Sequence, residues 1–313
     1  MILIMHKSVD GLFDRLGDLG YQAKTVSIEH LPLLQKQIEE QRSQRLLDSQ
    51  FFQERLGWVR FQVPESLPKA QSIIVVAVPR PQTRAVFTWN GVRRPLILPP
   101  TYTAYNAITE QVQNVLAKVL SEKGHKVTGT ALPLKLLAAR SGLVQYGRNN
   151  IGYASSMGSF LQLVAVYSDM PCEEDGWQEP AMLQACEKCD LCRRACPTGA
   201  IPSDRFLLRA ELCISYHNEK KGDISFPSWM DASWHNCIEG CMRCQRACPV
   251  DKQFLDWVGD EEEFSEEETA LLLEGAARER LPEETVRKLT HLDILNDIGI
   301  LPRNLGVFFG RQG

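Results

Sequence analysis

Hydrophobic and polar residues follow two different patterns along the first 170 residues. Apolar side chains recur three and four positions apart in two stretches, which predicts helices over 8–21 and 31–58. Residues 72–79 and 160–168 are instead short, mainly apolar runs rich in β-branched side chains, which predict buried strands. Because strands and helices alternate, this part of the chain is expected to form an α/β layer structure.

The segments between the two apolar runs contain turn signals and further helices. Residues 80–100 are rich in Pro and turn residues, and Asn90-Gly91 predicts a hairpin turn. Residues 101–125 predict a long amphipathic helix that ends at a Gly, and residues 134–143 predict a shorter one. The Gly-, Asn- and Ser-rich stretch 144–159 predicts a loop.

The composition is that of an ordinary folded protein. Of 313 residues, 44% are hydrophobic and 24% are charged, which argues against a disordered chain, and the length allows two domains. No run of 18 apolar residues is present, so no membrane span is predicted. The first residues lack a basic segment and a small-residue cleavage site, so no secretory signal is expected and a cytoplasmic protein is predicted.

Charge is distributed unevenly along the chain. Residues 249–313 contain 15 acidic and 7 basic side chains, a net charge of −8, which leaves 24 acidic and 28 basic ones, a net of +4, before them. The acidic run 260–268 predicts an exposed helix start, because acids in a first turn face the positive end of the helix dipole. Two short helices are predicted, over 265–281 and 283–299, in a segment poorly suited to contact a phosphate backbone.

The cysteines carry the strongest chemical signal. Nine of the ten lie between Cys186 and Cys248. Cys186, Cys189, Cys192 and Cys196 form a C-x2-C-x2-C-x3-C run that is followed by Pro, which is the spacing of bacterial ferredoxins. In that motif three thiolates surround one cluster and the fourth ligates another, so the motif normally occurs in pairs. A zinc site is the alternative, but zinc sites usually use pairs of Cys, often with His.

The second copy of the motif is incomplete. Cys241, Cys244 and Cys248 precede a Pro, whereas Cys237 departs from the two-residue spacing. Two [4Fe–4S] clusters need eight ligands. One predicted ligand set is Cys186, Cys189, Cys192 and Cys248, and the other is Cys196, Cys213, Cys241 and Cys244. Cys172 and Cys237 remain as spare cysteines, and Cys237 is an alternative ligand in place of Cys213.

Three segments together resemble a known family. They are AARSGLVQYGRNN, the first cysteine motif continued as CPTGAI, and the order LCISY and then GCMRCQRACP. Over residues 70–250 the chain resembles the epoxyqueuosine reductases, which are similar in turn to the catalytic region of reductive dehalogenases. The resemblance implies an α+β or α/β, nitroreductase-like body that binds cobalamin base-off, a ferredoxin-like domain with two clusters, and a short helical C-terminal tail. We therefore expect the body at 1–170, the cluster domain at 171–252 and the acidic extension at 253–313.

The resemblance also suggests site residues. Tyr102 and Tyr105 lie in the region that the family uses for substrate contact, and a phenol can donate a proton. Cobalamin contacts are expected from the Gly- and Ser-rich loop, at Gly147, Arg148, Asn149, Ser155 and Ser156. Where the family has an Asp that serves as a proton donor, residues 127–130 contain no acid.

These observations lead to two functional hypotheses. In the first, an external low-potential donor supplies electrons that pass through two clusters to cobalamin, which reduces a small organic substrate. In the second, the chain delivers low-potential electrons to the corrinoid or redox centre of a partner protein. The family's tRNA-contacting helical repeats are not found and the acidic segment follows the cluster domain, so tRNA is not expected as a partner.

Overall fold

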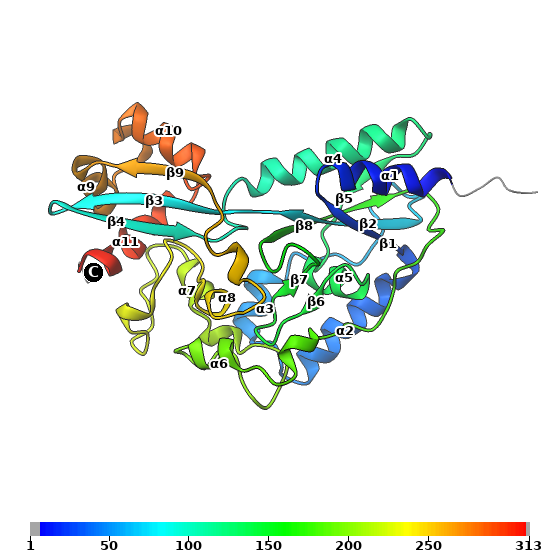
Figure 1. Cartoon of the computed structure of the whole chain (residues 1–313), viewed down its shortest axis with the longest axis horizontal. Coiled ribbons are helices and arrows are strands. Elements are labelled where there is room, and N and C mark those ends of the chain that lie inside the picture. Colours follow the sequence, from blue (N-terminus) through cyan, green and yellow to red (C-terminus); the bar gives the residue numbers. More distant parts are fainter. Residues whose placement is uncertain (1–6, 311–313) are drawn as a thin grey trace, which may run out of the picture. The chain divides into compact units, whose positions relative to one another are not determined.

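The computed structural model describes residues 7–310 and divides the chain into two compact units (Figure 1). The first unit consists of Met1–Pro79 and Asn106–Cys189, and the second of Arg80–Tyr105 and Asp190–Gly313. This grouping differs from the three consecutive segments expected from the sequence, because a hairpin from the body belongs with the cysteine-rich and acidic segments. The apolar start of the chain, which bears on the expectation of no secretory signal, lies partly at 1–6, outside the described residues.

The first unit is built on a four-stranded antiparallel sheet in the order β1-β2-β8-β5. The predicted buried strands are β2 (Ser72–Pro79) and β8 (Leu161–Ser168) at its centre. The edge strands β1 (Gln22–Ser27) and β5 (Val127–Gly129) are shorter, and the sequence patterns did not predict β1. The α+β character of the body is thereby confirmed, with antiparallel pairing throughout this sheet.

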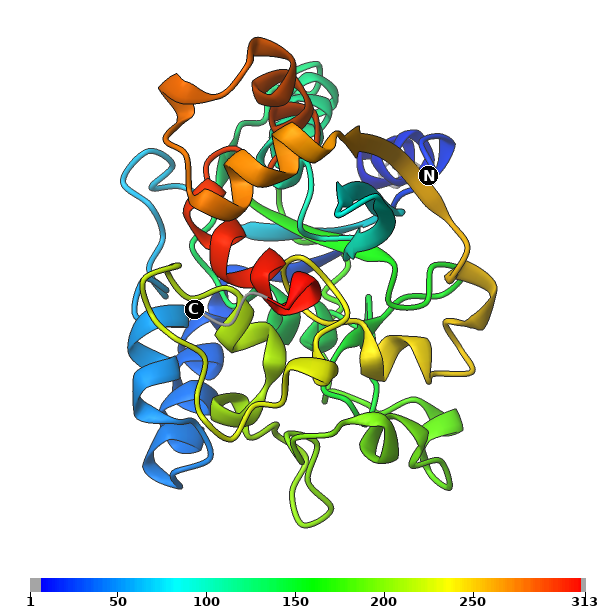
Figure 2. The ribbon, with the colours of Figure 1, turned by 90° about the vertical axis from the view of Figure 1, so that its left-hand side faces the viewer.

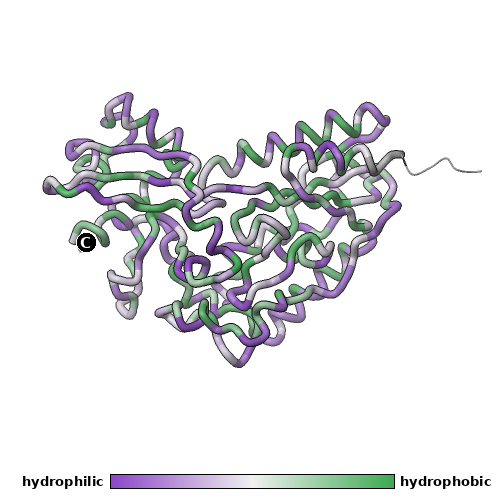
Figure 3. The backbone as a smooth tube through the Cα atoms, viewed as in Figure 1, coloured by the Kyte–Doolittle hydropathy of each residue, from purple (hydrophilic) through white to green (hydrophobic). Residues whose placement is uncertain are grey.

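Helices cover both faces of this sheet, which explains the continuous apolar run of β2. Ile73, Val75 and Ala77 belong to one core, whereas Ile74, Val76 and Val78 belong to the other. The first core includes residues of α2 (Leu31–Ser43) and α5 (Leu134–Arg140). The second includes residues of α1 (Lys7–Asp18) and α4 (Tyr105–Ser121), and the alternating colours along α4 in Figure 3 show its amphipathic pattern. Because side chains alternate across a strand, a strand between two helical layers is apolar at every position.

The remaining elements of the first unit are short. The helix predicted over 31–58 is interrupted, because α2 ends at Ser43 and α3 (Ser49–Arg55) begins after Asp48, whose side chain caps it. The predicted loop at 144–159 contains the two-residue strands β6 (Gln145–Tyr146) and β7 (Gly152–Tyr153), which pair with each other.

A hairpin and an added strand form the sheet of the second unit. β3 (Gln82–Trp89) and β4 (Val92–Leu98) are antiparallel, and both Asn90 and Gly91 have positive φ, as a two-residue hairpin turn requires. β9 (Val258–Phe264) pairs with β3 in parallel. The prediction that the acidic run begins as a helix is wrong for 260–264, which lie in β9. Arg84 and Arg93 on the hairpin pair with Glu261 and Glu263, so strand pairing satisfies these acids.

The acidic segment after β9 contains three helices, which Figure 2 shows as one group. They are α9 (Glu266–Glu274), α10 (Glu283–His291) and α11 (Leu301–Phe309), of which the first two lie within the predicted helices. Ser265 and Glu268 form a capping box at the start of α9, so the expected acidic first turn is present one residue after the strand ends. The apolar residues of these three helices pack with β3 and β4 around Phe87, Leu98 and Phe264.

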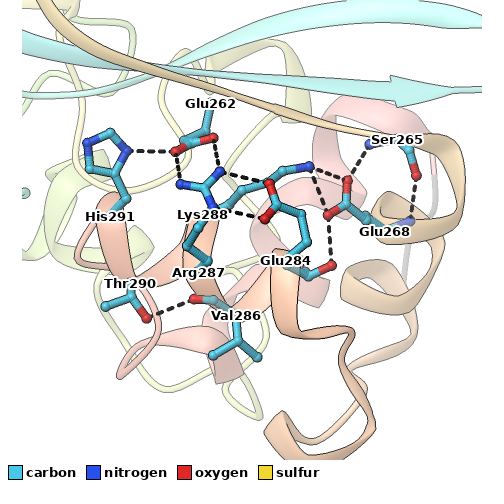
Figure 4. A network of polar contacts seen from close by, with 10 residues as sticks. Glu262, Ser265, Glu268, Glu284, Val286, Arg287, Lys288, Thr290 and His291 are labelled. Carbon is cyan, nitrogen blue, oxygen red and sulfur yellow. Dashed lines mark hydrogen bonds and ion pairs between the residues drawn. The ribbon is translucent and has the colours of Figure 1, made fainter.

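Several acids of this segment form ion pairs (Figure 4). Arg287 and His291 contact Glu262, and Lys288 contacts the buried Glu268 at 2.8 Å. Burial alone would raise the pKa of Glu262, but its hydrogen bonds to Arg287 and His291 lower it below the ordinary value. Arg287 and Lys288 belong to the same segment, so these pairs leave its net charge of −8 unchanged, whereas Arg84 and Arg93 of the hairpin offset two of its acids.

Three short α-helices contain or flank cysteines, namely α6 (Leu191–Ala195), α7 (Ile214–Asn218) and α8 (Arg243–Arg246), and 3-10 turns at Gln184–Cys186 and Ala210–Leu212 contain or precede two more. Within the described range no helix has the length and apolar character needed to cross a membrane.

Candidate metal centre

Four thiols of the second ligand set lie within the second unit. Cys196 follows α6, Cys213 directly precedes α7, and Cys244 lies in α8. Burial raises the pKa of the Cys213 thiol to about 11, and the nearby thiols of Cys241 and Cys196 contribute to this shift. Burial also raises the pKa of Cys244 well above its ordinary value, with contributions from Cys241, Cys213 and Cys196 and from Cys192 of the first set. Cys196, Cys213, Cys241 and Cys244 thus lie in one unit, and their ligation of one cluster stays a prediction.

This arrangement fits a thiolate-bound cluster in its chemistry. All ten cysteines lie in the described range and none forms a disulfide. In residues 7–310 no three Cys, His, Asp or Glu side chains converge closely enough to hold a single metal ion, whereas a [4Fe–4S] cluster takes one thiolate per iron. Because burial raises the pKa of the Cys213 and Cys244 thiols, iron binding would release protons from these two groups.

Cys237, the alternative ligand, is fully buried beside the second set. Its Sγ donates a hydrogen bond to Asn236 Oδ1 at 3.0 Å. Burial raises the pKa of this thiol far above its ordinary value, and the nearby Cys241 raises it further. The thiol of Cys237 thus contacts Asn236, and the choice between Cys213 and Cys237 as ligand stays a prediction.

Buried amides from α7 and α11 hold the loops that carry the second set. Asn304, which is 1% exposed, donates from Nδ2 to the carbonyls of Asn218 and Ile238 at 3.0 and 2.8 Å. Asn218 in turn donates to the carbonyl of Gly240, the residue before Cys241, at 2.9 Å. Arg303 adds hydrogen bonds to the carbonyls that follow α7. The C-terminal helix therefore supports the segments next to Cys213 and Cys241, which no sequence pattern indicated.

The first ligand set is divided between the two units. Cys186 and Cys189 belong to the first unit, and Cys192 and Cys248 to the second, so their convergence on one cluster stays a prediction. Within the first unit, Arg148 holds the loop that carries Cys186 and Cys189. Its Nη2 donates to Cys186 O at 2.5 Å, its Nε donates to Cys189 O at 2.7 Å, and its backbone N–H donates to Cys186 Sγ at 3.4 Å. Arg148, predicted to contact cobalamin, thus contacts the cysteine loop.

The other residues predicted to contact cobalamin have different surroundings. A side chain at Gly147 would collide with Tyr153 and Asn149, so this Gly is needed for packing within the loop. Asn149 is buried and donates to Tyr153 Oη at 2.9 Å. Ser155 and Ser156 are exposed, and Gln22 donates to Ser155 O and Ser156 Oγ at 2.7 and 3.2 Å.

One residue of the same loop has an unsatisfied polar atom. Asn150 has positive φ, and its Oδ1 accepts a hydrogen bond from Lys135 at 2.9 Å. Its Nδ2 is buried and has no hydrogen-bond partner among the described residues. An unpaired buried donor is costly, so this atom fits an acceptor from a bound ligand, such as an amide carbonyl of a corrin rim. Asn150, Ser155 and Ser156 therefore fit cobalamin better than Arg148 and Asn149 do.

The two predicted proton donors differ in their surroundings. Tyr102 is half-buried, donates its hydroxyl hydrogen to Glu219, and lies so close to Gly240 that a side chain there would overlap its ring. Burial raises the pKa of Tyr102 well above its ordinary value, and Glu219 raises it further, so the phenol stays protonated and is a weak acid. Tyr105 is 40% exposed at the start of α4. Their catalytic role stays a prediction.

Comparisons with known proteins agree with this site. Residues 185–251 match the family model described as a 4Fe-4S double cluster binding domain. The epoxyqueuosine reductase of Staphylococcus aureus is 30% identical over 197 residues, which cover 60% of this chain and 50% of that protein. The structure of epoxyqueuosine reductase from Streptococcus thermophilus is 18% identical with a TM-score of 0.67, covering 98% of this chain and 82% of that one. An epoxyqueuosine reductase crystallised with an epoxyqueuosine-modified tRNA-Tyr stem loop is 19% identical with a TM-score of 0.64, covering 97% and 81%.

These matches confirm the predicted kinship and the predicted pair of [4Fe–4S] clusters. The chain is a relative of the epoxyqueuosine reductases and shares their fold. It spans about half the length of the curated relatives that it matches, 50% and 57% in two of them.

Proposed function

We propose that this chain is an iron–sulfur reductase that takes electrons from an external low-potential donor and, with bound cobalamin, reduces an organic substrate. The observation that carries the proposal is that Cys196, Cys213, Cys241 and Cys244 all belong to the second unit. The double-cluster match over 185–251 and the relatives named epoxyqueuosine reductase support it. When bound, cobalamin supplies a cobalt centre that cycles between oxidation states.

Residues of the first unit would hold the cobalamin. Asn150 Nδ2 is a buried donor without a partner, and Ser155 and Ser156 present hydroxyl groups on the same loop. Arg148 would act indirectly, because it orders the Cys186–Cys189 loop. The chain's own contribution is thus to orient the cofactor through amide and hydroxyl contacts, as polar groups in ligand sites generally do.

The substrate is a separate part of the proposal. The expectation that tRNA is not a partner was based on the helical repeats that are not found and on the acidic segment, but Arg84 and Arg93, which lie outside that segment, pair with two of its acids. One relative with the same fold was crystallised with a tRNA stem loop, so the comparisons do not support that expectation. The absence of an acid at 127–130 favours a substrate other than the epoxide.

The competing function is delivery of electrons to a partner's corrinoid or redox centre. The observation that favours it concerns proton supply, since Tyr102 is bound to Glu219 and residues 127–130 contain no acid. A carrier needs no proton donor, because it transfers electrons only.

Anaerobic reconstitution followed by titration with cobalamin tests the proposal. We expect stoichiometric binding with the absorption spectrum of the base-off form. Asn150→Asp keeps the oxygen that Lys135 contacts and removes the unpaired donor, so it should weaken binding about tenfold, the effect of one hydrogen bond. If the protein with its full iron content leaves cobalamin unbound, the reductase proposal is wrong and the carrier hypothesis gains support. A second titration with a modified tRNA stem loop tests the substrate.

A further inference from the structure

The amide of Asn236 has a fixed orientation between two cysteines. Its Oδ1 accepts hydrogen bonds from the backbone N–H of Met242 and from Cys237 Sγ, both at 3.0 Å. An amide oxygen accepts hydrogen bonds and an amide nitrogen only donates them. These two donors therefore identify the atom that faces them as Oδ1. The Nδ2 group therefore faces Cys241 Sγ, at 3.6 Å.

A second polar side chain contacts another sulfur of the same ligand set. Thr198 Oγ1 lies 3.4 Å from Cys196 Sγ, and the backbone N–H of Ala200 donates to Thr198 Oγ1 at 3.3 Å. A thiolate bound to iron has no hydrogen, so in the cluster-bound protein the hydroxyl must be the donor in this contact. One donor thus follows the first cysteine motif, and the other precedes the second motif.

We propose that Asn236 and Thr198 raise the reduction potential of one and the same cluster, the one bound by Cys196, Cys213, Cys241 and Cys244. This inference rests on the ligand set in the proposed function. On reduction the cluster gains one electron from the external donor, passing from [4Fe–4S]²⁺ to [4Fe–4S]⁺, and no bond is broken. Hydrogen bonds to the sulfurs stabilise the added negative charge, so they favour the reduced state.

The same geometry gives Cys237 a role. Its thiol holds the oxygen of Asn236 and thereby keeps Nδ2 directed at Cys241. Cys237 is thus a positioning residue that acts on the cluster through Asn236, and it is not an iron ligand.

The first ligand set provides an internal reference. Its observed donor is the backbone N–H of Arg148, 3.4 Å from Cys186 Sγ, and a side-chain replacement at 198 or 236 leaves this hydrogen bond in place. A change confined to one of two cluster signals is therefore attributable to the second set.

The test is a redox titration, followed by electron paramagnetic resonance, of the anaerobically reconstituted full chain. Asn236→Asp keeps both acceptor contacts and replaces the donor by an oxygen, and Thr198→Val removes the hydroxyl at nearly constant volume. We expect each variant to lower the midpoint potential of the same cluster signal and to leave the other unchanged. Thr198→Ser, which retains the hydroxyl, should behave as the wild type. Cys237→Ala should keep the wild-type iron content and shift the same signal by less than Asn236→Asp.

The contrary results are distinct from one another. Unchanged potentials in Asn236→Asp and Thr198→Val, with iron content intact, overturn this inference and leave the proposed function standing. Shifts of two different signals show that Cys196 and Cys241 ligate different clusters and overturn the ligand set. Loss of about half the iron from Cys237→Ala makes Cys237 a ligand and overturns both.

Discussion

The two cysteine motifs have nearly the same spacing but are supported in different ways. The loop of Cys186 and Cys189 is held by one half-exposed side chain, that of Arg148, through carbonyl groups in the same unit. The segments next to Cys213 and Cys241 are held by the buried amides of Asn218 and Asn304. Similar motifs can therefore give clusters of different robustness, because the robustness depends on residues outside the motif.

The C-terminal segment also has a different place in the structure from the one that its sequence suggests. From its sequence this segment is an acidic helical cap. In the structure, Asn304 and Arg303 of α11 bind the loops next to the second ligand set, and β9 completes the sheet of the hairpin. The segment is thus part of the scaffold of one ligand set.

Asn304→Leu should have the largest effect of the substitutions, and it should affect the second ligand set. It leaves the buried carbonyl of Ile238 without this donor and removes one of the hydrogen bonds to Asn218 O, a loss of about 3 kcal/mol in the stability of these loops. We expect the second cluster to be lost, which would halve the iron content and remove one of two resonance signals. Equal loss of both signals would contradict the claim that different residues hold the loops of the two ligand sets.

Arg148→Ala should have the complementary and smaller effect. It removes two hydrogen bonds from a charged group to the Cys186 and Cys189 carbonyls, worth about 2 kcal/mol in a partly exposed setting. The first cluster should then be lost sooner than the second on exposure to a chelator, as followed by iron release. Arg148→Lys has only one nitrogen donor group in its side chain. Its rate of iron release from the first cluster should therefore lie between those of the wild type and Arg148→Ala. Faster loss of the other signal would show that Arg148 does not support the first set.

Glu266→Gln should have the smallest effect. The carboxylate accepts hydrogen bonds from the backbone N–H groups of Asn90 and Gly91, at 3.0 and 3.2 Å, so it closes the hairpin turn from the start of α9. The variant should reduce the free energy of unfolding by about 1 kcal/mol, measured by denaturant titration, without a change in iron content. Glu283→Gln, at an exposed acid in the first turn of α10, serves as the control and should reduce stability by less, because it loses only the interaction with the helix dipole. A loss of iron in Glu266→Gln would show that the hairpin affects the ligand sets.

Local sequence signals predicted those elements that depend on local causes. The β2 run is apolar because both of its faces are buried, and the Asn90-Gly91 pair suits the positive φ of a hairpin turn. The strand β9 was not predicted, because its acids resemble a helix start unless their partners Arg84 and Arg93 are known. These partners are distant in sequence, so no periodic pattern reveals the pairing.

For the site, too, local sequence patterns did not reveal contacts between residues distant in sequence. Spacing predicted a second ligand set whose four cysteines all belong to the second unit, and their ligation of one cluster stays a prediction. Arg148 was predicted as a cofactor contact from the family resemblance, yet its guanidinium contacts the cysteine loop. Asn218 and Asn304 were not predicted at all, since an isolated Asn in a short helix gives no signal of the carbonyls that it will meet.

Iron content in two cysteine variants tests the central claim, that two clusters are bound by crossed ligand sets, most directly. Wild-type protein purified anaerobically should contain about eight iron atoms per chain. Cys213→Ala should lose about half of them, because one cluster loses a ligand, whereas Cys237→Ala should retain them all. Full iron content in Cys213→Ala together with half in Cys237→Ala would contradict the assignment, and a wild type that contains zinc and no iron would contradict the account as a whole.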